Sequence, residues 1–260
     1  MKILYALILG IVQGLTEFLP ISSSGHLMLF SSIFGIEEGS VFFSVLLHFA
    51  SLIAVIIVFW KDVVELLKNP FGKDMQKILI ATIPTVIIAL VVEFVFDESF
   101  LMLFVGFGFL ISAVVIFITS MLQRKKKCLS LEISKKQALV VGVVQGLAVF
   151  PGISRSGSTI CACLTQGIDR EKSAKFSFLI SIPIIVGGMG FEIVKGIKNG
   201  FGDVEFLPCL VGFMASFLVA LFSIKIMMKL IKKGSWFGFS IYLIILAIIV
   251  LLNQFVFAWF

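Results

Sequence analysis

The chain has 260 residues, of which 60% are hydrophobic and 14% are charged, and its formal net charge is +6 at pH 7. Soluble domains carry about 25% charged residues, and a soluble fold of this length has too little interior to hide so much apolar surface. The composition therefore excludes a soluble domain. It predicts an all-α integral membrane protein, because a helix satisfies its own backbone hydrogen bonds in lipid.

A segment near the N-terminus recurs in the second half of the chain. Residues 10–27, GIVQGLTEFLPISSSGHL, align without a gap with residues 142–159, GVVQGLAVFPGISRSGST, and ten of the eighteen positions are identical. Identity of this extent predicts two halves of one ancestral unit, repeat 1 at about 1–122 and repeat 2 at about 133–258. We therefore expect the first copy to belong to the folded protein and not to a cleaved signal peptide.

Three apolar stretches follow each copy of the segment, and each is long enough to cross a bilayer, which takes about 20 helical residues. We predict spanning helices at about 41–60, 78–96, 101–121, 173–194, 206–230 and 237–258. The first three, shifted by the offset of the repeat (132 residues), fall close to the last three. Each half of the single membrane domain therefore consists of one motif segment and three spans.

The two motif segments, about 3–34 and 137–167, are apolar runs interrupted in the middle by Pro, Gly and Ser. Pro and Gly end helices, and serines bond their own backbone. Such a break at membrane depth is tolerated only inside protein or beside a wet cavity. We therefore expect each segment to form a re-entrant helical hairpin, and the alternative is one kinked spanning helix per motif.

The distribution of basic residues favours the hairpins. If the motif segments do not cross the membrane, seventeen of the twenty-one Lys and Arg gather on one side, including Arg124–Lys127 in the joining loop at about 122–136. The positive-inside rule makes that side cytoplasmic, so that both termini face outward. Each half then crosses three times in opposite orientation. This is an inverted-topology repeat, whose broken helices meet near the midplane.

The tips of the expected hairpins concentrate the polar residues of the chain. They hold Glu17, Ser22, Ser23, Ser24 and His26 from the first copy, and Ser154, Arg155, Ser156, Ser158 and Thr159 from the second. An ionisable group at membrane depth costs about 2.5–3.5 kcal/mol even on lenient scales. We therefore interpret the charged tips as a functional site, the alternative being a structural ion pair. The glycine pairs Gly10/Gly14 and Gly142/Gly146 have the spacing of close helix packing, which suits two hairpins that touch.

These residue types suit a phosphorylated ligand. Arg155 offers a permanently charged fork of donors, and Ser22–Gly25 and Ser154–Gly157 place hydroxyls and backbone N–H groups at helix starts, where anions bind. Glu17 fits either a divalent cation that bridges phosphates or a general base. His26 can act as base, acid or nucleophile. Because the acid–base groups and the cation lie in different copies, the asymmetry favours catalysis over symmetric binding.

Three motifs carry a resemblance to a known family. Gln13-x-x-x-Glu17, then PISSSGH at residues 20–26 and PGISRSGST at residues 151–159, resemble the signatures of the undecaprenyl-diphosphatase family, the bacitracin-resistance phosphatases of bacteria. The resemblance covers nearly the whole chain. It implies hydrolysis of undecaprenyl diphosphate to undecaprenyl phosphate and inorganic phosphate, which recycles the lipid carrier for cell-wall synthesis and confers bacitracin resistance. It also implies a divalent cation, Mg²⁺ or Ca²⁺, and a site that faces outward from the bacterial plasma membrane.

The family's motifs fall on the residues at the two tips. We expect catalytic roles for Glu17, Ser23, His26 and Arg155, with Glu17 also as metal ligand, and substrate binding by Gln13, Ser22, Ser24, Gly25, Ser154, Ser156, Gly157 and Thr159. Whether Ser23, His26 or a water attacks phosphorus stays open at this point. The chain departs from the family at Gln13, which is often Glu, and at Ser44 and His48, where an acidic residue and a Gln are expected. We interpret His48 as a core histidine and not as a site residue.

A transporter or flippase of polyprenyl phosphates is the alternative function, because inverted repeats usually serve alternating access. A carrier would move the lipid through the same pocket without releasing phosphate. The expected partners are the polyprenyl diphosphate lipid and the membrane, with no nucleic acid, and the sequence leaves a homodimer open.

Overall fold

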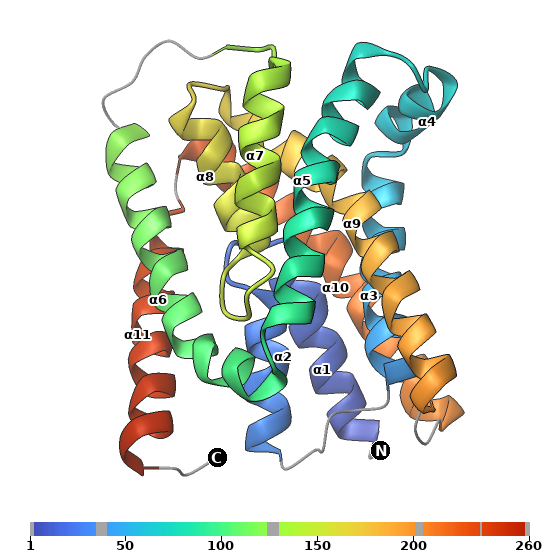
Figure 1. The fold of residues 1–260 in the computed structure, drawn as a ribbon, viewed down its shortest axis with the longest axis vertical. Coiled ribbons are helices and arrows are strands. Elements are labelled where there is room, and N and C mark those ends of the chain that lie inside the picture. The colour runs from blue at the N-terminus through green and yellow to red at the C-terminus, as the bar shows by residue number, and fades with distance from the viewer. Residues whose placement is uncertain (1–2, 35–40, 124–129, 201–204, 235, 258–260) are drawn as a thin grey trace.

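The computed structural model describes residues 3–34, 41–123, 130–200, 205–234 and 236–257 (Figure 1). The extended regular elements among these residues are all helices, in chain order α1 (Ile3–Thr16), α2 (Ser23–Ile33), α3 (Val41–Val58), α4 (Trp60–Lys68), α5 (Lys73–Val95), α6 (Glu98–Gln123), α7 (Lys135–Leu147), α8 (Arg155–Thr165), α9 (Arg170–Asn199), α10 (Phe206–Lys233), α11 (Gly238–Leu252) and the π-helix Asn253–Phe257. The prediction of an all-α fold is confirmed.

Five of the described helices are long and apolar enough to cross a membrane, namely α5, α6, α9, α10 and α11 with the π-helix that continues it. The chain bends by 84° between α3 and α4, and these two count as a sixth span only when taken together. The six predicted spans coincide with α3, α5, α6, α9, α10 and α11, so a multi-pass helical membrane protein is confirmed at this level. Helix α4 was not predicted, because it lies between the predicted spans at about 41–60 and 78–96.

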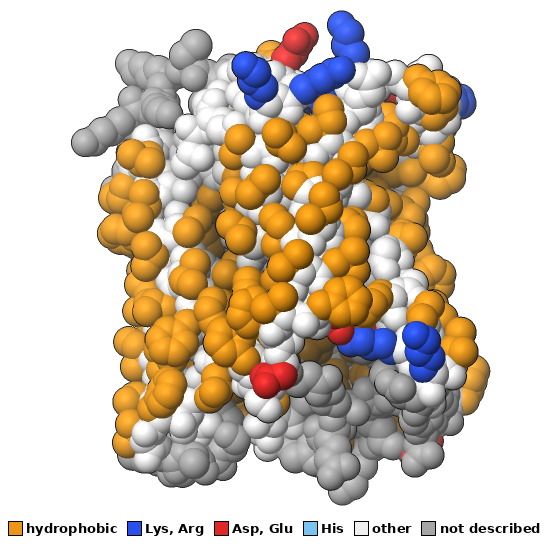
Figure 2. All heavy atoms as spheres, in the orientation of Figure 1, with side chains coloured by type: hydrophobic (Ala, Val, Ile, Leu, Met, Phe, Trp, Pro, Cys, Tyr) orange, Lys and Arg blue, Asp and Glu red, His pale blue; other side chains and the backbone are white. Residues whose placement is uncertain are grey.

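The outer surface of the molecule is apolar over most of its height. Figure 2 shows hydrophobic side chains covering the middle of this face, whereas Lys and Arg gather mainly at the upper end. Large apolar residues such as Ile87 and Phe94 of α5 are exposed. A helix that is apolar all round is stable only where lipid or protein surrounds it, so this surface suits the interior of a bilayer.

The two motif segments lie at opposite ends of the molecule and meet in the middle. In Figure 1, α1 and α2 occupy the lower half, α7 and α8 the upper half, and the turns that join each pair point toward each other. Neither pair runs the full height of the molecule. Residues 17–22 and 148–154 therefore come together near the centre, which is where the site described below is found.

The repeated glycines seat α1 and α7 against long helices. A Cβ atom added to Gly10 would overlap the carbonyl oxygen of Gly212 in α10, and one added to Gly142 would overlap the carbonyl oxygen of Ala81 in α5. Only glycine permits such close approach of two backbones. Our expectation that these glycines suit contact between the two hairpins was wrong, because they face α10 and α5 instead.

Residues 35–40, between the first motif segment and the first predicted span, and the basic run Arg124–Lys127 lie outside the described residues. The membrane orientation that we predicted from the loop charges therefore stays a prediction, as do the boundaries of the two repeats.

Candidate active site

Two helices begin at the polar motifs, and equivalent residues of the repeat cap them. Ser22 precedes α2, and its Oγ accepts a hydrogen bond from the Gly25 N–H at 3.4 Å. Ser154 precedes α8, and its Oγ accepts from the Gly157 N–H at 3.1 Å. Helix N-termini carry a partial positive charge, so both ends attract an anion placed between the two turns.

The two turns differ in backbone strain. Ser22 has φ 68° and ψ 104°, and it is the one non-glycine residue with positive φ among the described residues. Such a conformation costs on the order of 1–3 kcal/mol and persists only where surrounding contacts hold it. In the second turn the positive φ falls on Gly152, at 83°, and Ser154 is extended, with φ −72°. The first turn is therefore strained where the second is relaxed.

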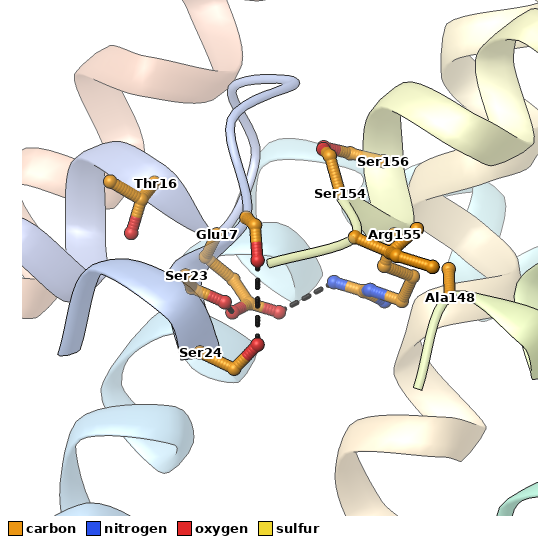
Figure 3. A pocket seen from close by; sticks show the side chains of 10 residues that line it. Thr16, Glu17, Ser23, Ser24, Ala148, Ser154, Arg155 and Ser156 are labelled. Atoms are coloured by element: carbon orange, nitrogen blue, oxygen red, sulfur yellow. Dashed lines mark hydrogen bonds and ion pairs between the residues drawn. The ribbon is translucent and has the colours of Figure 1, made fainter. Parts of the chain in front are cut away.

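A polar cavity of about 40 Å³ lies between the two turns (Figure 3). Its walls are Thr16, Glu17, Ser22, Ser23, Ser24, Ala148, Ile153, Ser154, Arg155 and Ser156. Eight of these ten form four pairs at the offset of the repeat, Thr16/Ala148, Ser22/Ser154, Ser23/Arg155 and Ser24/Ser156. The cavity therefore lies between corresponding faces of the two copies.

Glu17 is the centre of the polar contacts in this cavity. Its Oε1 accepts from Arg155 Nη2 at 2.5 Å, and its Oε2 accepts from Ser23 Oγ at 2.6 Å and from Gln13 Nε2 at 3.0 Å. Figure 3 shows Arg155 reaching across from the second turn toward Glu17. The carboxylate is 6% exposed, and burial of a charge is tolerated when it is paired and hydrogen-bonded.

Two atoms of the same cluster are buried and have no partner among the described residues. These are Nη1 of Arg155, a hydrogen-bond donor, and Oε1 of Gln13, an acceptor. Most buried polar side-chain atoms in native structures have a partner, so each exception calls for an explanation. An anion beside Arg155 and a cation beside Gln13 would satisfy both atoms.

The whole chain was compared with known protein families. A family model described as bacitracin resistance protein BacA matches residues 6–249. The chain belongs to the bacitracin resistance protein BacA family.

The resemblance expected from the motifs is thus confirmed over nearly the whole chain. The undecaprenyl-diphosphatase of Carboxydothermus hydrogenoformans is 38% identical over 252 residues, covering 96% of each chain. That of Halothermothrix orenii is 39% identical over 262 residues, covering 97% of this chain and 98% of its own. That of Thermosipho africanus is 41% identical over 250 residues, covering 94% and 97%.

His48 contacts the Gln13–Glu17 pair in this BacA-family chain, so our interpretation of it as a core histidine was wrong. Its Nδ1 is 3.0 Å from Gln13 Nε2 and 3.9 Å from Glu17 Oε2. The Gln13 amide donates to both Glu17 and His48, which places the His48 proton on Nε2. Ser51 Oγ, one turn later in α3, lies 3.4 Å from the same nitrogen. A polar residue inside an apolar span was the signal for this position.

His26 does not line the cavity. It is 3% exposed, its Nδ1 lies 2.7 Å from the Ser22 carbonyl oxygen, and its Nε2 lies 2.7 Å from the Tyr242 hydroxyl of α11. Both ring nitrogens are therefore engaged away from Ser23 and Glu17. The structure does not arrange His26 as the attacking group or as the base for Ser23, although we expected a catalytic role.

Four expected substrate-binding residues are not part of the cavity lining. Gly25 and Gly157 allow the two turns to pack closely, because a Cβ on Gly25 would lie 2.9 Å from the Gly152 Cα and one on Gly157 would lie 3.1 Å from the Pro20 Cβ. Thr159 bonds Ser177 of α9 at 2.6 Å. Gln13 contacts the cavity wall through Glu17, and its amide also contacts His48 and Ser51 of α3.

Three lining residues were missed by sequence reasoning, namely Thr16, Ala148 and Ile153. Thr16 and Ala148 directly follow the aligned Gly-Leu pairs at residues 14–15 and 146–147. Ile153 precedes the serine that caps α8. Their positions in the repeat were the available signal, and their side chains carry no charge that would have marked them.

The donor set of this family member suits a cation that takes most of its ligands from substrate and water. No group of three or more His, Cys, Asp or Glu able to hold a metal occurs in the described ranges. Glu17 supplies one carboxylate, and Gln13 supplies an amide oxygen that accepts no hydrogen bond from the part of the chain that the structure describes. Mg²⁺ is commonly bound by one or two carboxylates plus phosphate oxygens, so these residues fit it.

Proposed function

We propose that this protein is an undecaprenyl-diphosphate phosphatase, which hydrolyses undecaprenyl diphosphate to undecaprenyl phosphate and inorganic phosphate. The observation that carries this proposal is that Glu17 bonds both Arg155, whose Nη1 has no partner among the described residues, and the hydroxyl of Ser23. Relatives named undecaprenyl-diphosphatase at 38–41% identity support it. The reaction returns the lipid carrier to cell-wall synthesis, and the family description supports a role in bacitracin resistance.

The membrane arrangement proposed is an inverted repeat of two re-entrant hairpins in the bacterial plasma membrane, with the termini and the site facing outward. The meeting of the α1–α2 and α7–α8 turns in the middle of the molecule supports it (Figure 1). The paired residues of the cavity wall support it as well. The apolar tail of the substrate then stays in lipid while the diphosphate enters between the turns.

We propose that phosphate oxygens of the substrate replace Glu17 as the partner of Arg155. The cavity of about 40 Å³ holds little more than a water molecule, so a diphosphate must separate the two turns. Arg155 then pairs with phosphate oxygens through both of its terminal nitrogens. The N-termini of α2 and α8 and the hydroxyls of Ser22, Ser24, Ser154 and Ser156 supply further donors.

Ser23 Oγ is the proposed nucleophile. Its 2.6 Å hydrogen bond to Glu17 is the geometry of a hydroxyl held by a general base. Glu17 takes the proton as Oγ bonds the terminal phosphorus and the bond from that phosphorus to the bridging oxygen breaks. Undecaprenyl phosphate leaves with that oxygen, and Arg155 balances the charge that forms on the transferred group. Glu17 passes that proton to the departing phosphate oxygen and becomes a carboxylate again. It then deprotonates a water that attacks the phosphorus, the bond from phosphorus to Ser23 Oγ breaks, inorganic phosphate leaves, and Glu17 returns the proton to Oγ.

A divalent cation, Mg²⁺ or Ca²⁺, is proposed to bind to Glu17 and to Gln13 Oε1. When bound, it supplies neutralisation of the diphosphate oxygens.

The test of this function is phosphate release from undecaprenyl diphosphate by purified protein in detergent, with and without EDTA. We expect release by the wild type and its loss in Arg155→Ala. A folded wild-type protein that releases no phosphate would refute the proposal. The names of the relatives do not support the transporter alternative, because those that we compared are named as phosphatases.

A further inference from the structure

His26 joins α2 to α11 through a pair of short hydrogen bonds. A backbone carbonyl oxygen only accepts, so the 2.7 Å contact with the Ser22 carbonyl places the His26 proton on Nδ1. The neutral ring then has a lone pair on Nε2, and the Tyr242 hydroxyl donates to it at 2.7 Å. The two rings are nearly parallel, with centroids 5.8 Å apart. Tyr242 therefore stabilises one tautomer of His26, the tautomer that bonds Ser22.

The carbonyl that His26 holds belongs to the strained residue of the first turn. Ser22 has φ 68°, and the backbone N–H of His26 reaches the same carbonyl only at 3.4 Å. The shorter bond from Nδ1 is thus the main constraint on the peptide that joins Ser22 to Ser23. The orientation of that peptide determines where α2 begins and where Ser23 Oγ points.

The second copy of the repeat lacks this arrangement. Ser158 stands at the position of His26, and Ser154 at the position of Ser22 has an ordinary φ of −72°. The histidine therefore accompanies the strained turn and the Ser23 hydroxyl in one copy only. This distribution links the histidine to the hydroxyl and not to the general packing of a hairpin.

We propose that Tyr242 is a positioning residue for phosphoryl transfer. Its hydroxyl keeps His26 in the Nδ1–H tautomer, the ring holds the Ser22 carbonyl, and the held turn aims Ser23 Oγ at Glu17 and at the phosphorus. The proposal rests on the proposed function, because it takes Ser23 as the attacking group. It assigns His26 a role through Ser22 and no contact with the reacting atoms.

The Tyr242→Phe variant tests the role of the hydroxyl separately from that of the ring. The ring of Tyr242 also lines an open, mainly apolar groove of about 440 Å³ together with Ile21, Leu230, Gly238 and Phe239. Tyr242→Phe keeps this ring and removes only the donor to His26. Tyr5 is the other tyrosine of the chain, and its ring pairs with Phe34 at 5.2 Å. Tyr5→Phe is therefore the matched control.

The first readout is the tautomer of His26, observed by ¹⁵N nuclear magnetic resonance of the full-length protein labelled at histidine. The chain has two histidines, so His48→Gln assigns both ring signals. We expect His26 protonated at Nδ1 and His48 at Nε2 in the wild type. Tyr242→Phe should move the His26 ring nitrogens toward an averaged tautomer, and Tyr5→Phe should leave them unchanged. Unchanged His26 signals in Tyr242→Phe would overturn the proposal.

The second readout separates kcat from KM for phosphate release. Loss of one hydrogen bond predicts a fall in kcat of roughly fivefold to tenfold in Tyr242→Phe, with KM unchanged and Tyr5→Phe at the wild-type value. His26→Asn keeps a donor for the Ser22 carbonyl and should retain more kcat than His26→Ala. Equal loss in these two variants, or wild-type kcat in Tyr242→Phe, would overturn the proposal. A wild type without phosphate release refutes the proposed function instead, and the tautomer measurement then decides the link between His26 and Tyr242 alone.

Discussion

Glu17 and Arg155 are 138 residues apart in the chain, and a hydrogen bond of 2.5 Å joins Oε1 of the first to Nη2 of the second. This contact connects the start of the first turn, directly after α1, to the start of α8 across the cavity. Each side chain neutralises the buried charge of the other. We therefore expect substitutions of the two residues to have non-additive effects on stability and on activity.

Removal of either charge alone should destabilise the protein more than removal of both. A buried ion pair that loses one partner leaves an uncompensated charge and costs about 3–5 kcal/mol. We expect Glu17→Gln and Arg155→Met each to lower the thermal unfolding midpoint in detergent, and the double variant to recover most of the loss. Phosphate release should be absent in all three. Additive losses of stability in the double variant would contradict the pairing.

Ser23→Ala should abolish phosphate release, because Ser23 Oγ is the hydroxyl bonded to Glu17. Loss of an attacking group typically lowers kcat by several orders of magnitude. Rapid acid quenching of wild type with substrate labelled in the terminal phosphate should yield phosphoserine at residue 23. Ser24→Ala is the comparison, since Ser24 lines the same cavity without a hydrogen bond to Glu17, and its kcat should stay within about tenfold of wild type. Label on no residue during turnover would assign the attack to water.

Gln13→Glu should strengthen divalent cation binding. The change places a second carboxylate beside Glu17, where a cation relieves the repulsion between two negative groups. We expect protein stripped with EDTA to bind Mg²⁺ at least several-fold more tightly, measured by calorimetry without substrate. Weaker binding than in the wild type would show that the Gln13 amide itself serves the cation better than a carboxylate.

Gly10→Ala and Gly142→Ala should destabilise the fold, since a Cβ atom at either position would overlap a backbone carbonyl oxygen of α10 or α5. Overpacking of this kind typically costs 1–3 kcal/mol. Gly190→Ala in α9 is the control, because nothing lies within 4 Å of an added Cβ there. The measurement is the unfolding midpoint of the three variants. Equal midpoints for Gly10→Ala and Gly190→Ala would contradict the close packing of α1 on α10.

The repeat and the apolar runs predicted the long apolar helices and the meeting of the two motifs, because hydrophobic length and Pro-Gly-Ser breaks are local properties of the chain. Helix starts at Ser23 and Arg155 follow from the serine caps in the same way. The contact between Glu17 and Arg155 was accessible too, since the repeat places both residues at tips.

Contacts that depend on how distant helices are rotated could not be predicted. Tyr242 lies 216 residues from His26, and nothing in its surroundings in the sequence marks it. His48 turns toward Gln13 because α3 packs beside α1 with that face inward, and the apolar character of α3 all round gives no preferred face. The partners of Gly10 and Gly142 were misassigned for the same reason, because the spacing shows that a helix approaches closely and not which helix it is.

The resting contact between Arg155 and Glu17 also bears on how a catalytic cycle ends. In the proposed cycle, inorganic phosphate and the Glu17 carboxylate compete for the same guanidinium once the phosphoserine is cleaved. The Glu17 carboxylate is tethered beside the guanidinium at high effective concentration. It can therefore displace the phosphate without help from another molecule. Closure of the two turns thereby promotes release of the product. A high concentration of free phosphate should inhibit the enzyme competitively with its substrate.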